Sequence, residues 1–391
     1  PTNVLVTGQD IIFFWVARMI MAGMEYKQQR PFEHVYFTGM VRDKQGRKMS
    51  KSLGNSPDLL DLIDRFGADA VRFGILISSP AGNDLLFDDS SCEQGRNFNN
   101  KLWNALKLVK LWEGRQSDGA PRAGTQLPFA VEWFEQRLNS VKAQVEELYK
   151  GFRLSEALKT IYSLIWDDFC SWYLEWAKPG FEQPIDKAVY EKTVAFFSEL
   201  MQLLHPFMPF ISEEIYHQLA ERSDDLCVKQ YTPALAVDSN IIEQGSLLQE
   251  AITAIRDARV KNNLKPKDPV ELAIQSEKSA QFEAISAILG KQVNAQVGFT
   301  SEAVPNSIAL VIGTNKFYIS SEQAVDTSVQ KEQLLKDLEY QQGFLASVQK
   351  KLSNERFVQN AKPEVVEVER KKASDAQEKI ETIQKSLALL G

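Results

Sequence analysis

The chain has 391 residues, of which 44% are hydrophobic and 25% are charged. This balance is typical of a folded protein, and the length exceeds what one compact core usually holds, so about two to four domains are expected. The net charge of −7 disfavours nonspecific nucleic-acid binding over the whole surface, although a local basic path is compatible with it. No run of about 18 uncharged apolar residues occurs, so we expect no membrane-spanning helix.

The cysteines and the first residues indicate the cellular context. Cys92, Cys170 and Cys227 lie far apart without Cys-X-X-Cys spacing, which argues against a zinc ribbon and against a disulfide scaffold. We therefore expect no protein-bound metal and a reducing, cytoplasmic environment. The sequence starts at Pro1 without an initiator Met or a targeting signal, which predicts a piece cut from a longer protein.

The first 80 residues alternate short apolar runs with turn signals. Residues 4–6 and 35–37 are apolar runs that end in Thr-Gly, and residues 10–24 between them have helical length and spacing. A polar segment rich in Lys and Arg follows at 42–52, and two helices separated by Gly67 are predicted after it. This order of strand, helix and strand is typical of an α/β domain.

From about residue 96 the pattern is almost wholly helical and predicts a helical bundle. Apolar residues recur at steps of three and four, in helices expected at 134–148, 154–172, 186–204 and 212–221. Six of the seven tryptophans fall between Trp103 and Trp176, and we expect them mainly to fill the core of this bundle.

Two further units are predicted after the bundle. A helix at 247–259 and strands at 270–274 and 309–312 indicate a small mixed α/β domain. In the tail, apolar residues alternate steps of four and three along 334–352 and again along 373–390. Two such narrow stripes predict an antiparallel coiled-coil hairpin rather than two separate surface helices.

The most specific feature of the sequence is the string Lys48-Met49-Ser50-Lys51-Ser52. On average residue usage, a given five-letter string of this kind occurs by chance in a chain of this length on the order of once in ten thousand. Its two lysines and two serines on one loop can place ammonium and hydroxyl groups around a polyphosphate. A solvated basic loop is the competing interpretation.

This string resembles the signature loop that closes on ATP in class I aminoacyl-tRNA synthetases. Three further segments make the chain similar to the valyl-tRNA synthetase family in particular: residues 7–19 (TGQDIIFFWVARM), 67–72 (GADAVR) and 96–104 (RNFNNKLWN). The motifs are strong over the first 105 residues. After that the similarity is architectural, since the family also carries a helical anticodon-binding domain and a C-terminal coiled coil.

The resemblance implies a multidomain, mainly α fold. The expected parts are the C-terminal part of a Rossmann-like α/β catalytic domain with a stem-contact region at 1–95, a helical anticodon-binding bundle at 96–240, a small α+β junction at 241–327, and a coiled-coil tRNA-binding arm at 328–391. Class I enzymes also use a HIGH-type motif with two histidines separated by two residues. No two of the three histidines, His34, His205 and His217, have that spacing, so we expect this chain alone to be inactive.

The resemblance also implies roles for individual residues. Gly8 and Asp10 match the segment that contacts the ATP ribose, and Met40 and Val41 lie where the backbone would meet adenine. Lys51, Lys48 and Ser52 would bind the phosphates, with the lysines neutralising charge on the departing pyrophosphate.

Ile11 and Trp15 match the pocket for the valine side chain, and their spacing of four favours one helical face. Plain core packing is the competing interpretation for both.

The implied reaction is attack of the valine carboxylate on the ATP α-phosphate, followed by transfer of valine to the 3′ end of tRNA(Val). It requires ATP with Mg²⁺ and no covalent protein intermediate. A monomer without membrane contact is expected. Exposed cations would bind the tRNA, at Arg96, Lys101 and Lys107 in the bundle, at Arg256, Arg259, Lys261 and Lys265 in the densest basic stretch, and at Arg356, Arg370, Lys371 and Lys372 in the hairpin. Ordinary surface charge competes with that role.

Three alternatives remain open. An isoleucyl-tRNA synthetase fragment is the nearest, but that family commonly ends in a cysteine-rich zinc module, which three scattered cysteines cannot form. The leucyl family fits the terminal hairpin less well. A noncatalytic RNA-binding or scaffold protein would explain the absent HIGH-type motif, but it gives no use for the lysine loop.

Overall fold

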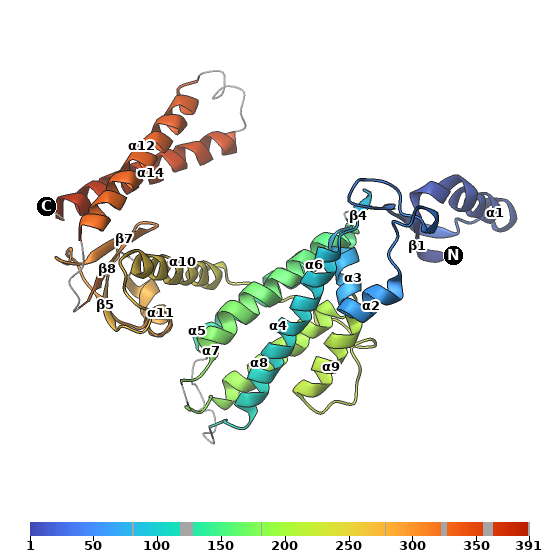
Figure 1. Ribbon diagram of the computed structural model, residues 1–391, viewed down its shortest axis with the longest axis horizontal. Coiled ribbons are helices and arrows are strands. Elements are labelled where there is room, and N and C mark those ends of the chain that lie inside the picture. Colours follow the sequence, from blue (N-terminus) through green and yellow to red (C-terminus); the bar gives the residue numbers. More distant parts are fainter. Residues whose placement is uncertain are drawn as a thin grey trace. The chain divides into compact units, whose positions relative to one another are not determined.

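The computed structural model describes residues 1–79, 82–117, 128–180, 182–277, 279–321, 327–354 and 363–389, so Arg356 lies outside the described residues. The chain forms two compact units, Pro1–Ile242 and Glu243–Gly391 (Figure 1). None of the described helices combines the length and the apolar run that a membrane crossing requires.

The first unit begins with a βαβ arrangement. Strands β1 (Thr2–Gly8) and β2 (Phe32–Thr38) pair in parallel along their whole length. They are connected by a 3₁₀ turn (Gln9–Ile11), a π-helical segment (Ile12–Val16) and helix α1 (Ala17–Lys27). This confirms the predicted order of strand, helix and strand.

A second strand pair and two short helices follow. Strand β3 (Val41–Arg42) pairs in parallel with β4 (Leu85–Leu86), and between them α2 (Leu59–Phe66) and α3 (Ala68–Ile77) meet at Gly67. Gly67 has a φ of 90°, which a residue with a Cβ rarely adopts. The turn between the two predicted helices therefore requires glycine.

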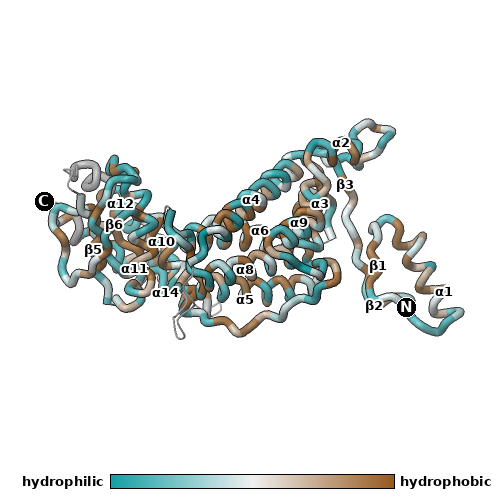
Figure 2. The backbone as a smooth tube through the Cα atoms, turned by 90° about the horizontal axis from the view of Figure 1, so that it is seen from below, coloured by the Kyte–Doolittle hydropathy of each residue, from teal (hydrophilic) through white to brown (hydrophobic). Residues whose placement is uncertain are grey.

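The helical bundle of the first unit has an aromatic core. Its helices are α4 (Asp89–Glu113), α5 (Phe129–Lys150), α6 (Leu154–Ser163), α7 (Leu174–Ala177), α8 (Lys187–Leu204) and α9 (Pro209–Leu219). A π-helical segment, Leu164–Tyr173, joins α6 to α7 without a break. Figure 2 shows apolar stretches recurring along these helices. The buried Trp112, Trp133 and Trp176 lie in the core as predicted, whereas Trp103 is exposed.

Helix α3 is tied to the bundle by the polar residues of segment 67–72. The Asp69 carboxylate accepts hydrogen bonds from the backbone N–H groups of Phe210 (3.3 Å) and Ile211 (2.6 Å), at the start of α9. The Arg72 guanidinium donates to two consecutive backbone carbonyl oxygens just before α9, each at 3.0 Å. Two polar side chains thus satisfy backbone groups at the α8–α9 turn.

Helix α4, which also packs on α3, runs through the predicted domain boundary at residue 95.

The second unit contains a four-stranded mixed sheet. Helix α10 (Ser239–Lys261) leads into it, and the strands lie in the order β6 (Ala295–Phe299), β5 (Val270–Gln275), β8 (Asn315–Ser320) and β7 (Ile308–Ile312). Strands β5 and β6 are parallel and are joined by α11 (Ser279–Val293), whereas the other pairs are antiparallel. Phe282 and Phe317 meet in the core with ring centroids 5.5 Å apart. The predicted helix and both predicted strands are confirmed.

The chain ends in two long helices that lie side by side, α12 (Thr327–Leu352) and α14 (Pro363–Leu389) (Figure 1). Val348, Ala376, Ile380 and Ile383 are buried along the predicted stripes, and Val366, which precedes the second stripe, is buried as well. The antiparallel helical hairpin predicted for the tail is therefore confirmed.

Candidate functional site

The lysine loop, residues 48–52, is held in a compact turn that follows β3. The backbone N–H of Met49 donates to the carbonyl oxygen of Val41 at 3.1 Å, and the N–H of Asp43 donates to the carbonyl oxygen of Arg47 at 2.9 Å. The chain thus folds back on β3 before it enters the loop. The loop is thus attached to the β3–β4 strand pair by backbone hydrogen bonds.

Two residues that the sequence-based prediction did not single out, Asp43 and Asn55, anchor the loop at both ends. The Asn55 amide donates to Asp43 Oδ2 at 2.9 Å and accepts from the backbone N–H of Ser50 at 2.9 Å. Asp43 also accepts from the Arg47 side chain and from the backbone N–H groups of Gln45 and Arg47. The Asn55 hydrogen bond, followed by the contacts with Arg47, lowers the pKa of Asp43 to about 2.

Ser50 organises the centre of the loop. Its hydroxyl accepts from the backbone N–H of Leu53 at 3.3 Å, so it caps the single 3₁₀ turn Lys51–Leu53. The Ser50 and Ser52 hydroxyl oxygens lie 3.1 Å apart. Gly54 then reverses the chain with a φ of 64°. The capped turn presents the Lys51 side chain to solvent.

The structure brings Lys48 close to another predicted ATP-binding residue, Asp10. Lys48 Nζ lies 3.7 Å from Asp10 Oδ2, with both side chains substantially exposed. The Asp10 carboxylate lies close to Gly8, since a Cβ added at Gly8 would be 2.7 Å from Asp10 Oδ1. Gly8, Asp10 and Lys48 therefore lie at one edge of the β1–β2 pair, where the first strand ends.

Met40 and Val41 differ in how far they are open to a ligand. The Met40 N–H donates to Asp84 Oδ1 at 2.9 Å, and its carbonyl oxygen accepts from the N–H of Leu85 at 2.9 Å. Both backbone polar groups of Met40 are therefore already bonded within the chain. Val41 lines an apolar hollow of 630 Å³ formed by β1, β2, α3 and the start of α6.

The two residues predicted for the amino-acid pocket lie at the π-helical segment after β1. Trp15 is 47% exposed, whereas Ile11 is half-buried. The neighbouring Phe13 and Phe14 are also exposed. Core packing within the described residues thus does not account for Trp15.

The cations predicted to contact tRNA in the bundle lie on α4 and differ in their surroundings. The Arg96 guanidinium pairs with Glu93 at 3.1 Å and lies over the Phe66 ring, 5.6 Å from its centroid. Lys101 Nζ lies 5.2 Å from the centroid of the Trp166 ring, and Lys107 is exposed.

In the second unit, Arg259 is buried, which differs from its predicted role in phosphate binding. Its guanidinium donates to the backbone carbonyl oxygens of Val293, Lys265 and Asp268. Because its donors are directed into the protein, Arg259 holds the chain after α10 and is not available to a phosphate on the surface. Arg256, Lys261 and Lys265 are exposed, and Arg370 on α14 lies 3.9 Å from Glu367.

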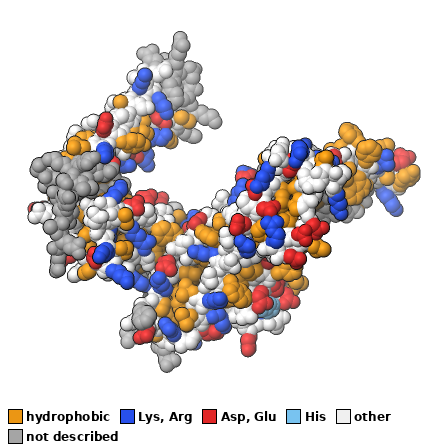
Figure 3. Space-filling model, in the orientation of Figure 1, with side chains coloured by type: hydrophobic (Ala, Val, Ile, Leu, Met, Phe, Trp, Pro, Cys, Tyr) orange, Lys and Arg blue, Asp and Glu red, His pale blue; other side chains and the backbone are white. Residues whose placement is uncertain are grey.

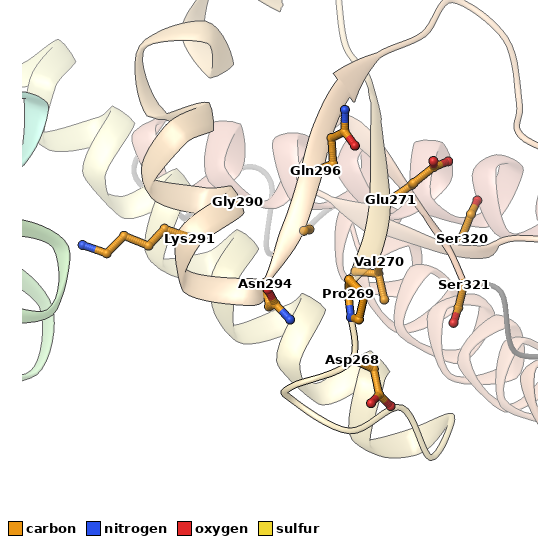
Figure 4. A pocket seen from close by; sticks show the side chains of 11 residues that line it. Asp268, Pro269, Val270, Glu271, Gly290, Lys291, Asn294, Gln296, Ser320 and Ser321 are labelled. Carbon is orange, nitrogen blue, oxygen red and sulfur yellow. The ribbon is translucent and has the colours of Figure 1, made fainter. Parts of the chain in front are cut away.

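A hollow of 780 Å³ in the second unit does not resemble a phosphate site. Its lining includes the carboxylates of Asp268 and Glu271, and Figure 4 shows the Lys291 side chain pointing away from both. Among the described residues that line the hollow, no cation is directed at the two carboxylates, and this arrangement disfavours a polyanion.

Comparison with known proteins identifies the parts. Residues 1–88 match the family model for class I tRNA synthetases (I, L, M and V), residues 131–274 match the anticodon-binding domain of tRNA ligase, and residues 326–391 match the valyl-tRNA synthetase tRNA-binding arm. All of the chain aligns with 44% of the valine–tRNA ligase of Parabacteroides distasonis at 47% identity, and with 44% of that of Phocaeicola vulgatus at 49% identity. The chain corresponds to the C-terminal portion of a valine–tRNA ligase.

A more distant relative also aligns with the whole chain. The valine–tRNA ligase of Symbiobacterium thermophilum is 37% identical over all of the chain and 46% of that protein. The chain thus spans less than half of the length of the curated relatives it matches. A solved leucyl-tRNA synthetase complex from Agrobacterium radiobacter aligns at 20% identity over 61% of the chain with a TM-score of 0.45, which is too low to support an argument about fold.

Within the valine–tRNA ligase framework, the lysine loop and the βα turn that carries Asp10 belong to the class I synthetase portion. The match of the tail to the valyl tRNA-binding arm favours the valyl over the isoleucyl family, and the alignment of the whole chain with valine–tRNA ligases argues against an unrelated scaffold protein. Asp43 and Asn55 were missed because neither is a phosphate ligand by type. Asp43 is nevertheless followed by Gly46 three positions later, and an Asp and a Gly at this spacing are a turn signal. This signal could have marked Asp43 as a structural residue.

Proposed function

We propose that this chain supplies the lysine loop and the tRNA-contacting surfaces of an ATP-dependent valine–tRNA ligase. The arrangement that carries the proposal is the anchored loop 48–52, which presents Lys51 to solvent and holds Lys48 Nζ 3.7 Å from Asp10 at the end of β1. A loop with fixed ends and exposed ammonium groups is suited to a polyanionic substrate, because its geometry needs little reorganisation when charge develops.

In the proposed activation step, the valine carboxylate attacks the α-phosphate of ATP, forming valyl-adenylate and releasing pyrophosphate. Lys51 and Lys48 would stabilise the negative charge that builds on the departing pyrophosphate, and the Ser52 hydroxyl would donate a hydrogen bond to it. Mg²⁺ would enter with ATP as part of the substrate. The second step transfers valine to a hydroxyl group at the 3′ end of tRNA(Val) and releases AMP.

Substrate contacts on the other side of the site are proposed for the β1 edge. Gly8 would let the ATP ribose approach the backbone, and Asp10 would accept hydrogen bonds from its hydroxyl groups. Val41 would contact adenine from the rim of its apolar hollow. Ile11 and Trp15 would bind the valine side chain, and the exposure of Trp15 is compatible with that role.

The pairing of Lys48 with Asp10 suggests how the loop responds to ATP. Both groups are exposed, so their attraction at 3.7 Å is weak and readily exchanged. A triphosphate offers Lys48 a stronger partner and frees Asp10 for the ribose. The same contact would thus keep the loop near the site before ATP arrives.

The tRNA contacts are proposed for Arg96, Lys101 and Lys107 on α4, for Arg256, Lys261 and Lys265 in the second unit, and for Arg370, Lys371 and Lys372 on α14. The family matches of 131–274 and 326–391 to tRNA-binding domains support the assignment in the second unit and on α14, and the residues on α4 lie outside both matches. Arg259 is left out because its guanidinium is bonded inside the protein. We further propose a monomeric, cytoplasmic ligase, and no valine activation by the chain alone, since its histidines form no HIGH-type motif.

Substitution of the loop lysine tests the proposal. In the complete ligase, Lys51→Ala should slow valine-dependent ATP–pyrophosphate exchange by roughly 10²- to 10³-fold, the scale for one transition-state electrostatic contact. Lys44→Ala is a matched control, because Lys44 is exposed nearby and pairs with Asp88 at 3.1 Å, outside the loop. An effect of Lys51→Ala no greater than that of Lys44→Ala would show that the loop has no catalytic part.

A further inference from the structure

Three side chains capable of metal binding converge beside the C-terminal half of α9. Glu213 and His217 are four residues apart on this helix, and Asp225 lies in the loop that follows it. His217 Nε2 is 3.2 Å from Glu213 Oε1 and 3.0 Å from Asp225 Oδ1. Figure 3 shows histidine beside several acidic side chains over α9.

The spacing of these atoms fits a small divalent ion. Zn²⁺ binds imidazole nitrogen and carboxylate oxygen at about 2.0–2.2 Å in a tetrahedral arrangement, which places neighbouring ligand atoms about 3.3 Å apart. The three candidate ligand atoms all lie within 4.8 Å of one another, and two of the three separations are 3.0 and 3.2 Å. An ion at their centre would require only small side-chain movements.

The charges also favour a cation. Two carboxylates approach the same ring nitrogen, and Nε2 carries at most one proton, so a single N–H would have to be shared between both oxygens. Even with a protonated imidazole, the three groups would together carry a net negative charge. A divalent ion with neutral His217 would balance both carboxylates.

Other contacts hold the ligands in place and leave one side open. The backbone N–H of Leu226 donates to Glu213 Oε1 at 2.9 Å, which fixes that carboxylate against the loop. His205 Nδ1 lies 3.6 Å from the other Glu213 oxygen. The Asp225 side chain is 63% exposed, so water can complete the coordination.

We propose that Glu213, His217 and Asp225 bind one Zn²⁺ ion. The ion joins the end of α9 to the loop 220–226 and so stabilises this corner of the bundle. The cysteine-based expectation of no protein-bound metal did not consider this site, because its ligands are one imidazole and two carboxylates.

Zinc binding by the purified, chelator-treated chain tests the proposal. We expect titration calorimetry with Zn²⁺ alone to show saturable binding at this site and a rise in Tm with added Zn²⁺. His217→Gln and Asp225→Asn should each weaken this binding by more than about 10-fold, since even changes to groups around a metal site cost that much. Both positions are exposed, so the variants should fold, and circular dichroism is the check for this.

Two matched controls separate this site from others. Glu214→Gln changes the neighbouring acid, which bonds to Gln218 instead, and Cys227→Ser removes the exposed thiol two residues beyond Asp225. Both should retain the affinity of the unsubstituted chain. The proposal is overturned if no saturable binding occurs, if His217→Gln and Asp225→Asn bind as the unsubstituted chain does, or if Cys227→Ser abolishes binding.

Discussion

The anchoring of the lysine loop by Asn55 predicts a measurable change in loop opening. The Asn55 amide accepts from the Ser50 N–H at 2.9 Å and donates to Asp43 at 2.9 Å and to the Lys48 carbonyl oxygen at 3.3 Å. Each such bond contributes about 0.5–1.5 kcal/mol, and Asn55 is half-buried, so Asn55→Ala should cost roughly 2 kcal/mol. The open population of the loop should then rise about 30-fold.

Hydrogen exchange of the loop amides is the appropriate assay. The N–H groups of Ser50 and Leu53 are both bonded in the anchored loop, and both should exchange about 30-fold faster in Asn55→Ala. Asn97→Ala, which replaces an exposed residue on α4, serves as the control and should leave this exchange unchanged. Unaltered protection of Ser50 and Leu53 in Asn55→Ala would refute the anchoring role.

Three further predictions concern other parts of the chain. The pKa of Asp43 is lowered to about 2. The stability that the ionised carboxylate contributes should therefore be complete above the ordinary value of 3.8 and lost as the pH falls towards 2. NMR titration of the Asp43 carboxyl carbon checks this, and a pKa near 3.8 would contradict it. Arg259→Ala should destabilise the second unit by roughly 3 kcal/mol in thermal unfolding, because it leaves buried carbonyl oxygens unbonded. Lys261→Ala replaces an exposed residue and should change the stability little. Equal destabilisation by the two substitutions would contradict the structural role of Arg259. Ending the complete ligase after Ser328 should raise the apparent KM for tRNA without changing valine activation, and an unchanged tRNA dependence would leave the hairpin with another purpose.

Local patterns were sufficient to predict most of the fold. The stripes of the tail predicted two paired helices because burial of each narrow face requires a partner of the same length, and Val348 and Ile380 are indeed buried. Strands β6 and β8 and helix α11 were not predicted. Strand β6 includes Gln296 and Gly298, which interrupt the apolar pattern that would indicate a strand. Pairing with β5 stabilises β6, and this pairing is not visible in the local sequence.

The candidate site was predicted only in part, because spacing along the chain does not specify contacts between distant segments. Lys48 and Asp10 lie 38 positions apart, and their pairing depends on how β3 follows β2. Arg259 illustrates the same limit in the other direction. A basic stretch predicts exposed charge, but the Arg259 guanidinium is buried, where it donates to the carbonyl oxygens of Val293 and Asp268.

Charging of tRNA by the complete ligase tests the central claim most directly. The full-length protein that contains this chain, with ATP, Mg²⁺ and tRNA(Val), should attach radioactive valine to the tRNA and should not attach leucine. The chain alone should attach none. Charging with isoleucine in preference to valine, or valine activation by the chain alone, would contradict the account given for the lysine loop and its place in the ligase.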